Sequence, residues 1–286
     1  MKTMIVDAHT HIFSPDVIAR RAEHVADDPC FRELYGNAKA KLKTAEELIT
    51  EMDSAGVDKA VIQNIGWSDP ETCRGTNDYL LEAAARYPKR LIPFIAVQPN
   101  SGRVAVSEIN RCVAAGARGI GELRPDTQGG FVGLERKVMR PLVEAAMAGD
   151  LVMCLHVDEP VGHHHAGKGS VTPQAIFPFI SSFPELKLIL AHWGGGLPFY
   201  TLMPEVKKAL GNVWFDSAAS PLLYQPEIYE RVADLAGGDR ILFGSDWPLL
   251  RQRRALEELR SVNLSTWTVK GIAGDNAAEL LGLKDE

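Results

Sequence analysis

Histidine and carboxylate side chains recur at positions where this chain could hold a metal ion. His9 and His11 stand two residues apart in the segment Asp7-Ala8-His9-Thr10-His11. In a β-strand, residues two apart point to the same side, so both imidazoles would converge on one point. Two imidazoles placed in this way can chelate one metal ion. The pair alone is equally compatible with two partly exposed histidines at a strand end that bind nothing.

Three further side chains of the same kind follow other apolar segments. His156 and His192 each end such a segment, and Asp246 follows a third within Phe243-Gly244-Ser245-Asp246-Trp247-Pro248. If these segments are strands of one barrel, all five side chains lie at the carboxyl-terminal rim, where barrels gather their active sites. Three imidazoles, a carboxylate and a water suit Zn²⁺ or a similar first-row ion. The alternative is a set of isolated histidines satisfied by neighbouring protein groups.

A repeating pattern of strands and helices is needed to position these side chains. Short apolar runs rich in β-branched residues alternate with longer runs of helical periodicity. Most apolar runs are continuously hydrophobic, as expected for parallel strands covered on both faces. The predicted strands are Met4–Ala8, Ala60–Ile65, Leu91–Val97, Gly119–Leu123, Leu151–Val157, Leu186–Ala191, Val213–Asp216 and Arg240–Gly244.

Helix ends are marked between these strands. Thr44-Ala45-Glu46-Glu47 resembles a capping box, and Ala55-Gly56 closes the same helix. The other predicted helices are Asn77–Tyr87, Val104–Ala115, Leu134–Ala148, Thr172–Phe183, Met203–Leu210, Pro226–Ala236 and Thr268–Leu281. Eight alternating strands favour a closed (β/α)8 TIM barrel of the α/β class over an open doubly wound sheet. No Gly-x-Gly-x-x-Gly turn follows the first strand, which argues against a dinucleotide-binding sheet.

The whole chain, residues 1–286, is expected to form this single domain, since no linker or low-complexity tract divides it. One connection, from Phe13 to Lys43, is long at roughly 30 residues. It includes Asp16–Val25, which has the composition of a short helix. In a barrel this connection would lie over the mouth as a lid or a substrate wall.

At this point the chain resembles a known family. His9-x-His11, His156, the segment Ala191-His192-Trp193-Gly194-Gly195-Gly196 and the segment Gly244-Ser245-Asp246-Trp247-Pro248 are similar to motifs of the amidohydrolase superfamily. The closest resemblance is to its branch that includes the aminocarboxymuconate-semialdehyde decarboxylase type, and it extends over the whole chain. The resemblance implies that His9, His11, His156 and Asp246 bind a single ion. It also implies that His192 contacts the metal-bound water or the substrate without being a primary ligand.

Glu122, in Gly119-Ile120-Gly121-Glu122-Leu123-Arg124, ends the fourth predicted strand. In binuclear members of the superfamily, a carbamylated Lys or a Glu from this strand bridges two metals. A bridging Glu122 would place His156 and His192 on a second ion. The alternative is a carboxylate that orients a ligand histidine or pairs with Arg124. We favour one divalent ion, with Zn²⁺ expected and Glu122 lining the site, and keep a second metal as the alternative.

Other side chains near the predicted mouth are candidates for substrate contact. Arg124 could bind a substrate carboxylate bidentately, although an ordinary ion pair would use it as well. Lys168 lies with His163–His165 in a segment after the fifth strand, where a solvated loop is the alternative. Trp193 and Trp247 adjoin His192 and Asp246 and could wall the pocket or pack in the core.

The expected reaction is hydrolysis of a small ester, lactone or amide. A divalent ion lowers the pKa of its bound water toward 7. His192 would then move a proton, and Asp246 could accept one from the attacking water. The alternative is a metal-dependent lyase that removes CO₂ from a small carboxylic acid without redox change. A third hypothesis is an inactive barrel that serves as a binding protein, which would usually have lost a metal ligand.

Composition limits the partners. The formal net charge is −6 and the isoelectric point is about 5.8, which argues against nucleic acid and anionic membranes as partners. A small molecule is the expected substrate, and a homo-oligomer is compatible with the sequence. The early acidic and histidine residues leave no room for a signal-peptide core, so a cytoplasmic protein is expected. Four scattered cysteines, none in a Cys-x-x-Cys pair, indicate neither a disulfide framework nor a thiolate metal site.

Overall fold

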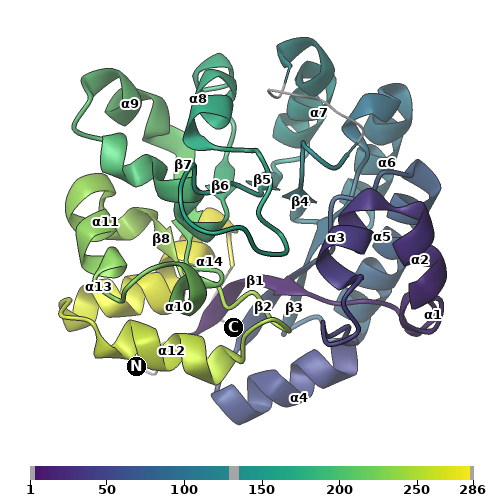
Figure 1. Cartoon of the computed structure of the whole chain (residues 1–286), viewed down its shortest axis with the longest axis horizontal. Coiled ribbons are helices and arrows are strands. Elements are labelled where there is room, and N and C mark those ends of the chain that lie inside the picture. The colour runs from purple at the N-terminus through teal and green to yellow at the C-terminus, as the bar shows by residue number, and fades with distance from the viewer. Residues whose placement is uncertain (1–3, 129–134, 284–286) are drawn as a thin grey trace.

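The computed structural model describes residues 4–128 and 135–283, and an eight-stranded parallel sheet lies at its centre. The strands pair in chain order from β1 to β8. The two end strands meet through backbone bonds, from Ala8 N to Phe243 O and from His11 N to Trp247 O, each 2.7 Å long. The predicted (β/α)8 barrel is therefore confirmed (Figure 1). The strands are β1 (Val6–His11), β2 (Lys59–Gln63), β3 (Leu91–Ile95), β4 (Gly119–Leu123), β5 (Val152–Leu155), β6 (Leu188–Leu190), β7 (Val213–Asp216) and β8 (Ile241–Leu242).

Helices surround the barrel and alternate with its strands (Figure 1). They are α1 (Pro15–Ala19), α2 (Arg21–Asp27), α3 (Pro29–Tyr35), α4 (Ala45–Ala55), α5 (Pro70–Arg86), α6 (Arg103–Ala114), α7 (Arg136–Ala148), α8 (Pro173–Ser182), α9 (Pro204–Ala209), α10 (Ser220–Leu223), α11 (Ile228–Ala236), α12 (Gln252–Ser261), α13 (Thr266–Lys270) and α14 (Asn276–Leu280). A π-helical turn, Gly271–Asp275, joins the last two. Short 3₁₀ segments are Pro99–Ser101, His192–Tyr200, Leu210–Asn212 and Gly238–Arg240. In the described chain, no helix is both long and apolar enough to span a bilayer.

Local sequence explains where several helices begin and end. Thr44 and Glu47 form the predicted capping box at the start of α4, and Gly56 ends that helix with a φ of 75°. Helix α5 begins at Pro70, earlier than predicted. The Asp69 carboxylate accepts a hydrogen bond from Thr72 N at 2.8 Å there, and proline is favoured in a first helical turn.

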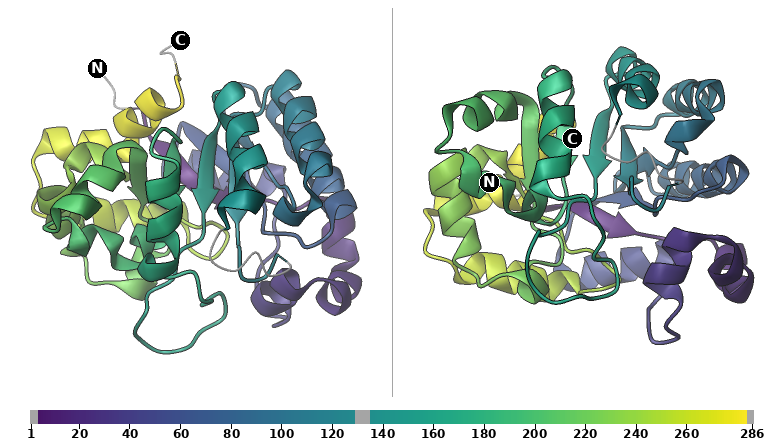
Figure 2. Two further views of the ribbon diagram at one scale, coloured as in Figure 1. Left: turned by 90° about the horizontal axis from the view of Figure 1, so that it is seen from above. Right: turned by 45° about the horizontal axis from the view of Figure 1, so that its top comes forward.

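Two apolar layers hold the barrel together. Inside it, alternate side chains of the strands form one cluster that includes Val61, Phe94 and Ile189. Leu280 and Ala277 of α14 belong to the same cluster, so this helix closes one end of the barrel (Figure 2, left). A larger cluster fills the space between the strands and the outer helices. The end opposite α14 is left for polar side chains.

The long connection after β1 forms three short helices, α1 to α3, where one was expected. They have an apolar cluster of their own, in which the Phe31 ring stacks on Trp67 at 5.2 Å between centroids and lies 6.2 Å from Phe13. Figure 2 (left) places them, with the loop between β5 and α8, at the end of the barrel away from α14. A role of residues 13–43 as a lid stays a prediction.

Replacing Gly274 with a larger residue should strongly lower the stability of the barrel. A Cβ at this position would lie 1.9 Å from Met4 O and 3.2 Å from Val6 N, both backbone atoms at the start of β1. We expect Gly274→Ala to lower the free energy of unfolding by about 3 kcal/mol, because the backbone must shift to remove the overlap. In the matched control Gly75→Ala, within α5, the new methyl meets no atom within 4 Å. That variant should gain about 0.5–1 kcal/mol from helix propensity. Urea unfolding measures both changes, and equal effects would contradict the prediction.

Candidate metal centre

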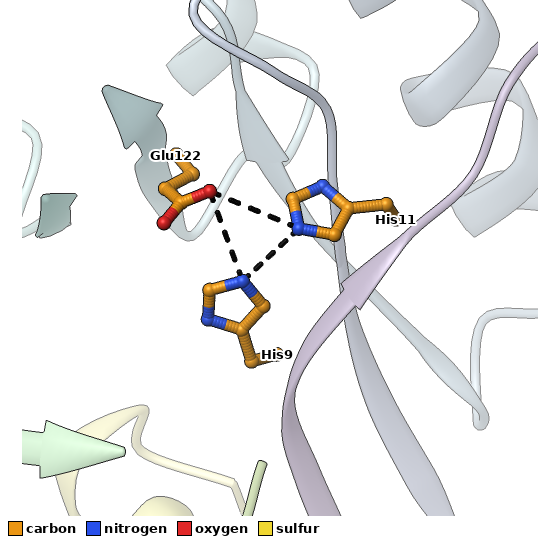
Figure 3. A group of neighbouring side chains, drawn as sticks. All are labelled: His9, His11 and Glu122. Carbon is orange, nitrogen blue, oxygen red and sulfur yellow. Dashed lines mark hydrogen bonds and ion pairs between the residues drawn. The ribbon is translucent and has the colours of Figure 1, made fainter. Parts of the chain in front are cut away.

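Two histidines at the carboxyl end of β1 face a glutamate at the end of β4 (Figure 3). The Nε2 atoms of His9 and His11 lie 3.0 Å apart. Glu122 Oε2 lies 3.9 Å from the first nitrogen and 3.8 Å from the second. Asp246 Oδ1, from the segment after β8, lies 3.9 Å and 3.3 Å from the same two atoms. Three widely separated segments thus bring two ring nitrogens and two carboxylate oxygens to one point.

Asp216, at the end of β7, fixes the orientation of the His9 ring. Its Oδ2 lies 2.8 Å from His9 Nδ1, and its Oδ1 accepts hydrogen bonds from the backbone nitrogens of His192 and Ala218, each at 3.0 Å. A carboxylate only accepts, so His9 Nδ1 carries the proton. Nε2 is the nitrogen that faces Glu122 and Asp246, and it offers its lone pair to a metal ion when the ring is neutral. This is the tautomer that a metal ligand requires.

Glu122 divides its carboxylate between two groups of histidines. Oε2 faces the pair on β1, whereas Oε1 lies 2.8 Å from His156 Nδ1 and 3.4 Å from His192 Nε2. Within each group of two histidines and Glu122, the candidate ligand atoms lie within 4.8 Å of one another. His156 therefore faces Glu122 and His192 in this structure.

The second nitrogen of His156 is also occupied. Nε2 lies 3.0 Å from Asp158 Oδ1 and 3.0 Å from the carbonyl oxygen of Gly167. Burial and the Arg124 guanidinium lower the pKa of His156, but the Asp158 and Glu122 carboxylates outweigh them and raise it to about 10. For His156 to bind the same ion as His9 and His11, one of its ring nitrogens would have to be released. Either Nδ1 would lose its contact with Glu122, or Nε2 would lose its contacts with Asp158 and Gly167. Ligation by His156 stays a prediction.

Two of the predicted residues sit on unusual backbone. His192 has a φ of 56° and Asp246 a φ of 61°, in the left-handed region that residues other than glycine rarely adopt. Such conformations cluster at functional sites, where the surrounding structure holds them in place. Asp7 provides part of that support, since its carboxylate accepts hydrogen bonds from Ser245 N at 3.0 Å and from Gln252 Nε2 at 2.8 Å. Asp7 thereby fastens β1 to the segment that carries Asp246.

The electrostatics of the cluster keep its carboxylates ionised. Burial alone would raise the pKa of Glu122, but His156 lowers it to well below its usual value. The pKa of Asp246 is likewise lowered by its hydrogen bond to His11 and by the charge on His9. These directions follow from imidazoles and carboxylates balancing one another in a buried site.

The donor set fits a divalent metal ion. Imidazole nitrogens and carboxylate oxygens are the ligands that Zn²⁺, Mn²⁺ and similar ions share. All of these residues are buried, with exposed fractions of 9% or less. A divalent ion would supply the positive charge that a cluster of ionised carboxylates requires. His9, His11, Asp246 and Glu122 are therefore the residues that the structure offers for it.

Arg124 was predicted to bind a substrate carboxylate bidentately, but in the structure its guanidinium is already partly bonded within the protein. Its side chain is fully buried, and Nη2 donates to Glu33 Oε1 at 3.1 Å and to the Gly167 carbonyl at 2.9 Å. A guanidinium binds a carboxylate bidentately either through Nε and Nη2 or through Nη1 and Nη2. Nη2 is needed in both cases, and here it is already occupied. Nε and Nη1 are buried without a partner among the described residues. Lys168 donates to the Val161 carbonyl and stays in the loop after β5.

The two tryptophans lie in the core. Trp193 is fully buried, with its ring perpendicular to Tyr229 at 4.8 Å between centroids. Trp247 is 5% exposed and belongs to the same outer apolar cluster. Trp247 also lines a pocket of about 440 Å³, together with Lys41, Lys43, Glu47, Thr50, Glu51, Pro248 and Arg251. These placements favour packing roles, and substrate contact by either tryptophan stays a prediction.

Sequence reasoning missed Asp216 and Asp158. Asp216 ends the predicted strand Val213–Asp216, at the same rim as the five side chains that were chosen. That position was a usable signal, because carboxylates at strand ends commonly orient ligand histidines. Asp158 lies two residues after His156, beyond the strand, and nothing in its spacing indicates that it contacts the ring.

A comparison with family models identifies the relationship. The model described as amidohydrolase matches residues 6–283. The chain belongs to this amidohydrolase family. The 2-amino-3-carboxymuconate-6-semialdehyde decarboxylase of Dictyostelium discoideum is 22% identical over 345 aligned positions, covering 99% of this chain and 92% of the relative.

Solved structures give the same barrel. The 5-carboxyvanillate decarboxylase of Sphingomonas paucimobilis superposes with a TM-score of 0.79 at 18% identity, covering 99% of this chain and 100% of that one. The dihydroxybenzoic acid decarboxylase of Polaromonas sp. JS666 superposes with a TM-score of 0.74 at 20% identity, covering 100% and 98%. The latter structure contains manganese and the inhibitor 2-nitroresorcinol.

These relatives contradict the expectation of a hydrolase acting on an ester, lactone or amide. The named activities are decarboxylations, so the carboxy-lyase alternative is better supported. The residues alone did not separate the two reactions, because one fold with one metal centre can serve either. The bound manganese and the His/Glu cluster support a divalent metal, and neither one specifies zinc.

Asp216 should matter for metal affinity although it contacts Nδ1 of His9 and not Nε2, the nitrogen that faces the candidate metal site. Asp216→Asn should weaken metal binding about 10- to 100-fold, because the amide cannot hold the His9 tautomer as a carboxylate does. Competition against a chromogenic chelator measures the affinity. Asp234→Asn, on exposed α11, is the matched control. Equal affinity in wild type and Asp216→Asn would show that the His9 orientation does not depend on this bond.

Proposed function

We propose that this chain is a metal-dependent decarboxylase of a small hydroxylated aromatic or unsaturated carboxylic acid. The proposal rests mainly on the match with a named decarboxylase over 99% of the chain, and the buried His/carboxylate cluster supports it. In the reaction, the carbon–carbon bond to the carboxylate breaks and CO₂ leaves. The electron pair of that bond takes up one proton at the same carbon, so no oxidant or reductant is needed.

His192 is our candidate for the residue that delivers this proton. Its Nδ1 lies 3.1 Å from the carbonyl oxygen of Ala218, which can only accept, so Nδ1 carries a hydrogen. Nε2 is the nitrogen that faces Glu122 and the cluster. Proton exchange with a substrate therefore has to pass through Nε2. Asp246 is expected to bind the metal and to hold the neighbouring donors in place.

Arg124 is our candidate for binding the substrate carboxylate. Two nitrogens of the buried guanidinium, Nε and Nη1, have no partner among the described residues, and this carries an unfavourable free energy that a bound anion would relieve. Nε and Nη1 lie on different edges of the group, so a bidentate contact would also require Glu33 or Gly167 to release Nη2. His156 and Arg124 share the Gly167 carbonyl as an acceptor, so the guanidinium lies next to the candidate centre.

We propose a single divalent ion held by His9, His11 and Asp246, with His156 as the fourth ligand after its ring has moved. When bound, the ion would polarise the oxygen atoms of the substrate. Zinc is our expected metal, and manganese in a structural relative is the competing identity. The division of the Glu122 oxygens favours a specific alternative, in which a second ion binds Glu122, His156 and His192. The acidic formal net charge of −6 supports a small molecule as the partner.

The reaction type can be tested directly. Protein loaded with Zn²⁺ or Mn²⁺ is incubated with a panel of hydroxybenzoates and, separately, of lactones. We expect at least one hydroxybenzoate to release CO₂, which a coupled carboxylase assay measures. We expect the lactones to release no acid. Lactone opening without CO₂ release from any carboxylic acid would reject the decarboxylase.

His192→Ala should separate proton transfer from metal binding. Turnover should fall about 10²- to 10⁴-fold, which is the usual contribution of general acid catalysis. Metal content, measured by mass spectrometry, should stay at one ion per chain. Asp246→Ala is the comparison variant and should lose both activity and metal. Loss of a metal ion from His192→Ala would instead support the site with two ions.

A further inference from the structure

The last turn of α3 contacts three different segments at the barrel mouth. Glu33 accepts the hydrogen bond from Arg124, which follows β4. Leu34 lies so close to Gly167, in the loop after β5, that a Cβ on that glycine would be 3.2 Å from Leu34 Cδ2. Tyr35 packs edge-on against Phe13 beyond the end of β1, with ring centroids 5.0 Å apart. Three consecutive residues of α3 therefore border the region above the metal centre.

The Tyr35 side chain is held firmly while its hydroxyl is left without a partner. Its ring lies 5.0 Å from Phe13 and 5.1 Å from Phe31 between centroids. Its carbonyl oxygen accepts hydrogen bonds from Arg21 Nε at 3.1 Å and Nη2 at 2.7 Å, which fixes the end of the helix. Among the described residues, nothing forms a hydrogen bond with the phenol. A fixed polar group without a protein partner is available to a ligand.

The contacts of α3 place Tyr35 beside the centre, because its ring packs on Phe13, two residues after His11, and the neighbouring Leu34 lies against Gly167, whose carbonyl is 3.0 Å from His156 Nε2. Burial raises the pKa of Tyr35 well above its usual value, and the carboxylates of Asp246 and Glu122 raise it further. Both carboxylates belong to the candidate metal cluster, and their negative charge favours the protonated phenol. The hydroxyl therefore keeps its proton at neutral pH and acts as a hydrogen-bond donor.

We propose that Tyr35 is the residue that selects a hydroxylated substrate, by donating a hydrogen bond to a hydroxyl or phenolate oxygen of the bound acid. The assignment rests on the proposed function and deepens it. Arg124 carries the positive charge and suits the carboxylate, whereas the neutral Tyr35 donor suits an oxygen substituent on the ring or chain. Specificity for that substituent would come from α3, outside the strands that hold the metal.

The test is a binding cycle that does not depend on turnover. Calorimetry measures the affinity of metal-loaded wild type and Tyr35→Phe for 2-nitroresorcinol and for nitrobenzene, which has the nitro group but neither hydroxyl. We expect Tyr35→Phe to lower the affinity for 2-nitroresorcinol about 10-fold, which corresponds to the loss of one hydrogen bond. The affinity for nitrobenzene should not change. Tyr200→Phe, at a tyrosine that is 48% exposed, is the matched control and should alter neither affinity.

The outcomes separate this inference from the decarboxylase proposal. The variant removes a hydroxyl without a protein partner, so metal content and thermal unfolding should match wild type. Equal weakening of both ligands, no change in either, or no binding of 2-nitroresorcinol to wild type would each reject the role of Tyr35. If the 10-fold selective loss is found but no carboxylic acid releases CO₂, the binding role stands and the decarboxylase fails.

Discussion

The structure depends on a single buried carboxylate that lies between four imidazoles. Glu122 would be costly to bury alone, since an ionised group loses its hydration in the interior. Its two oxygens face His9 and His11 on one side, and His156 and His192 on the other. These partners come from β1, β5 and β6, so their mutual stabilisation exists only after the barrel has closed. The four imidazoles offset the free-energy cost of burying the Glu122 carboxylate. The same arrangement gathers the groups that can bind a cation.

Closure of the barrel is itself secured at this end. Strand β8 is short, and it meets β1 partly through side chains, with Asp7 accepting from Ser245 and Gln252. The Asp246 backbone nitrogen donates to His9 O at 3.0 Å. The candidate ligands are thus fixed by the contacts that join the first and last strands. Loosening the seam would misplace the metal cluster, whereas the opposite end of the barrel is sealed by apolar packing of α14.

Most of the architecture could be predicted from the sequence because it depends on local patterns. Short apolar runs, most of them continuous, marked the eight strands, and the capping box at Thr44 and Glu47 marked α4. Helix α12 was missed, since only Gln252, Ala255, Leu256 and Leu259 are buried in a segment otherwise rich in charge. The rim positions of His9, His11, His156, His192 and Asp246 were predicted from strand ends. The division of Glu122 between two groups depends on side-chain rotamers, which spacing does not determine.

The chemical outcome was harder to predict than the site. Metal-centred hydrolysis and decarboxylation use the same imidazoles and carboxylates, so residue types at strand ends do not distinguish them. The group that we propose to select the substrate, Tyr35, comes from outside the repeating pattern. Glu33 and Tyr35 lie in a connection whose length was noticed but whose side chains could not be placed. Their position follows from the packing of α3 on Phe13 and Trp67.

Helices α1 to α3 are packed around an apolar cluster separate from the two that stabilise the barrel. Its members include Phe13, Ile65 and Ala96, which follow β1, β2 and β3, so the cluster joins these helices to the rim of the barrel. Under the proposed roles, the metal-binding residues lie at strand ends and the substrate-selecting Tyr35 lies on α3, a helix that also has several exposed positions. On that division, a lineage with this architecture would acquire new substrates by changing residues of α1 to α3 that point away from the shared apolar cluster, while the strand ends keep the residues proposed to bind metal.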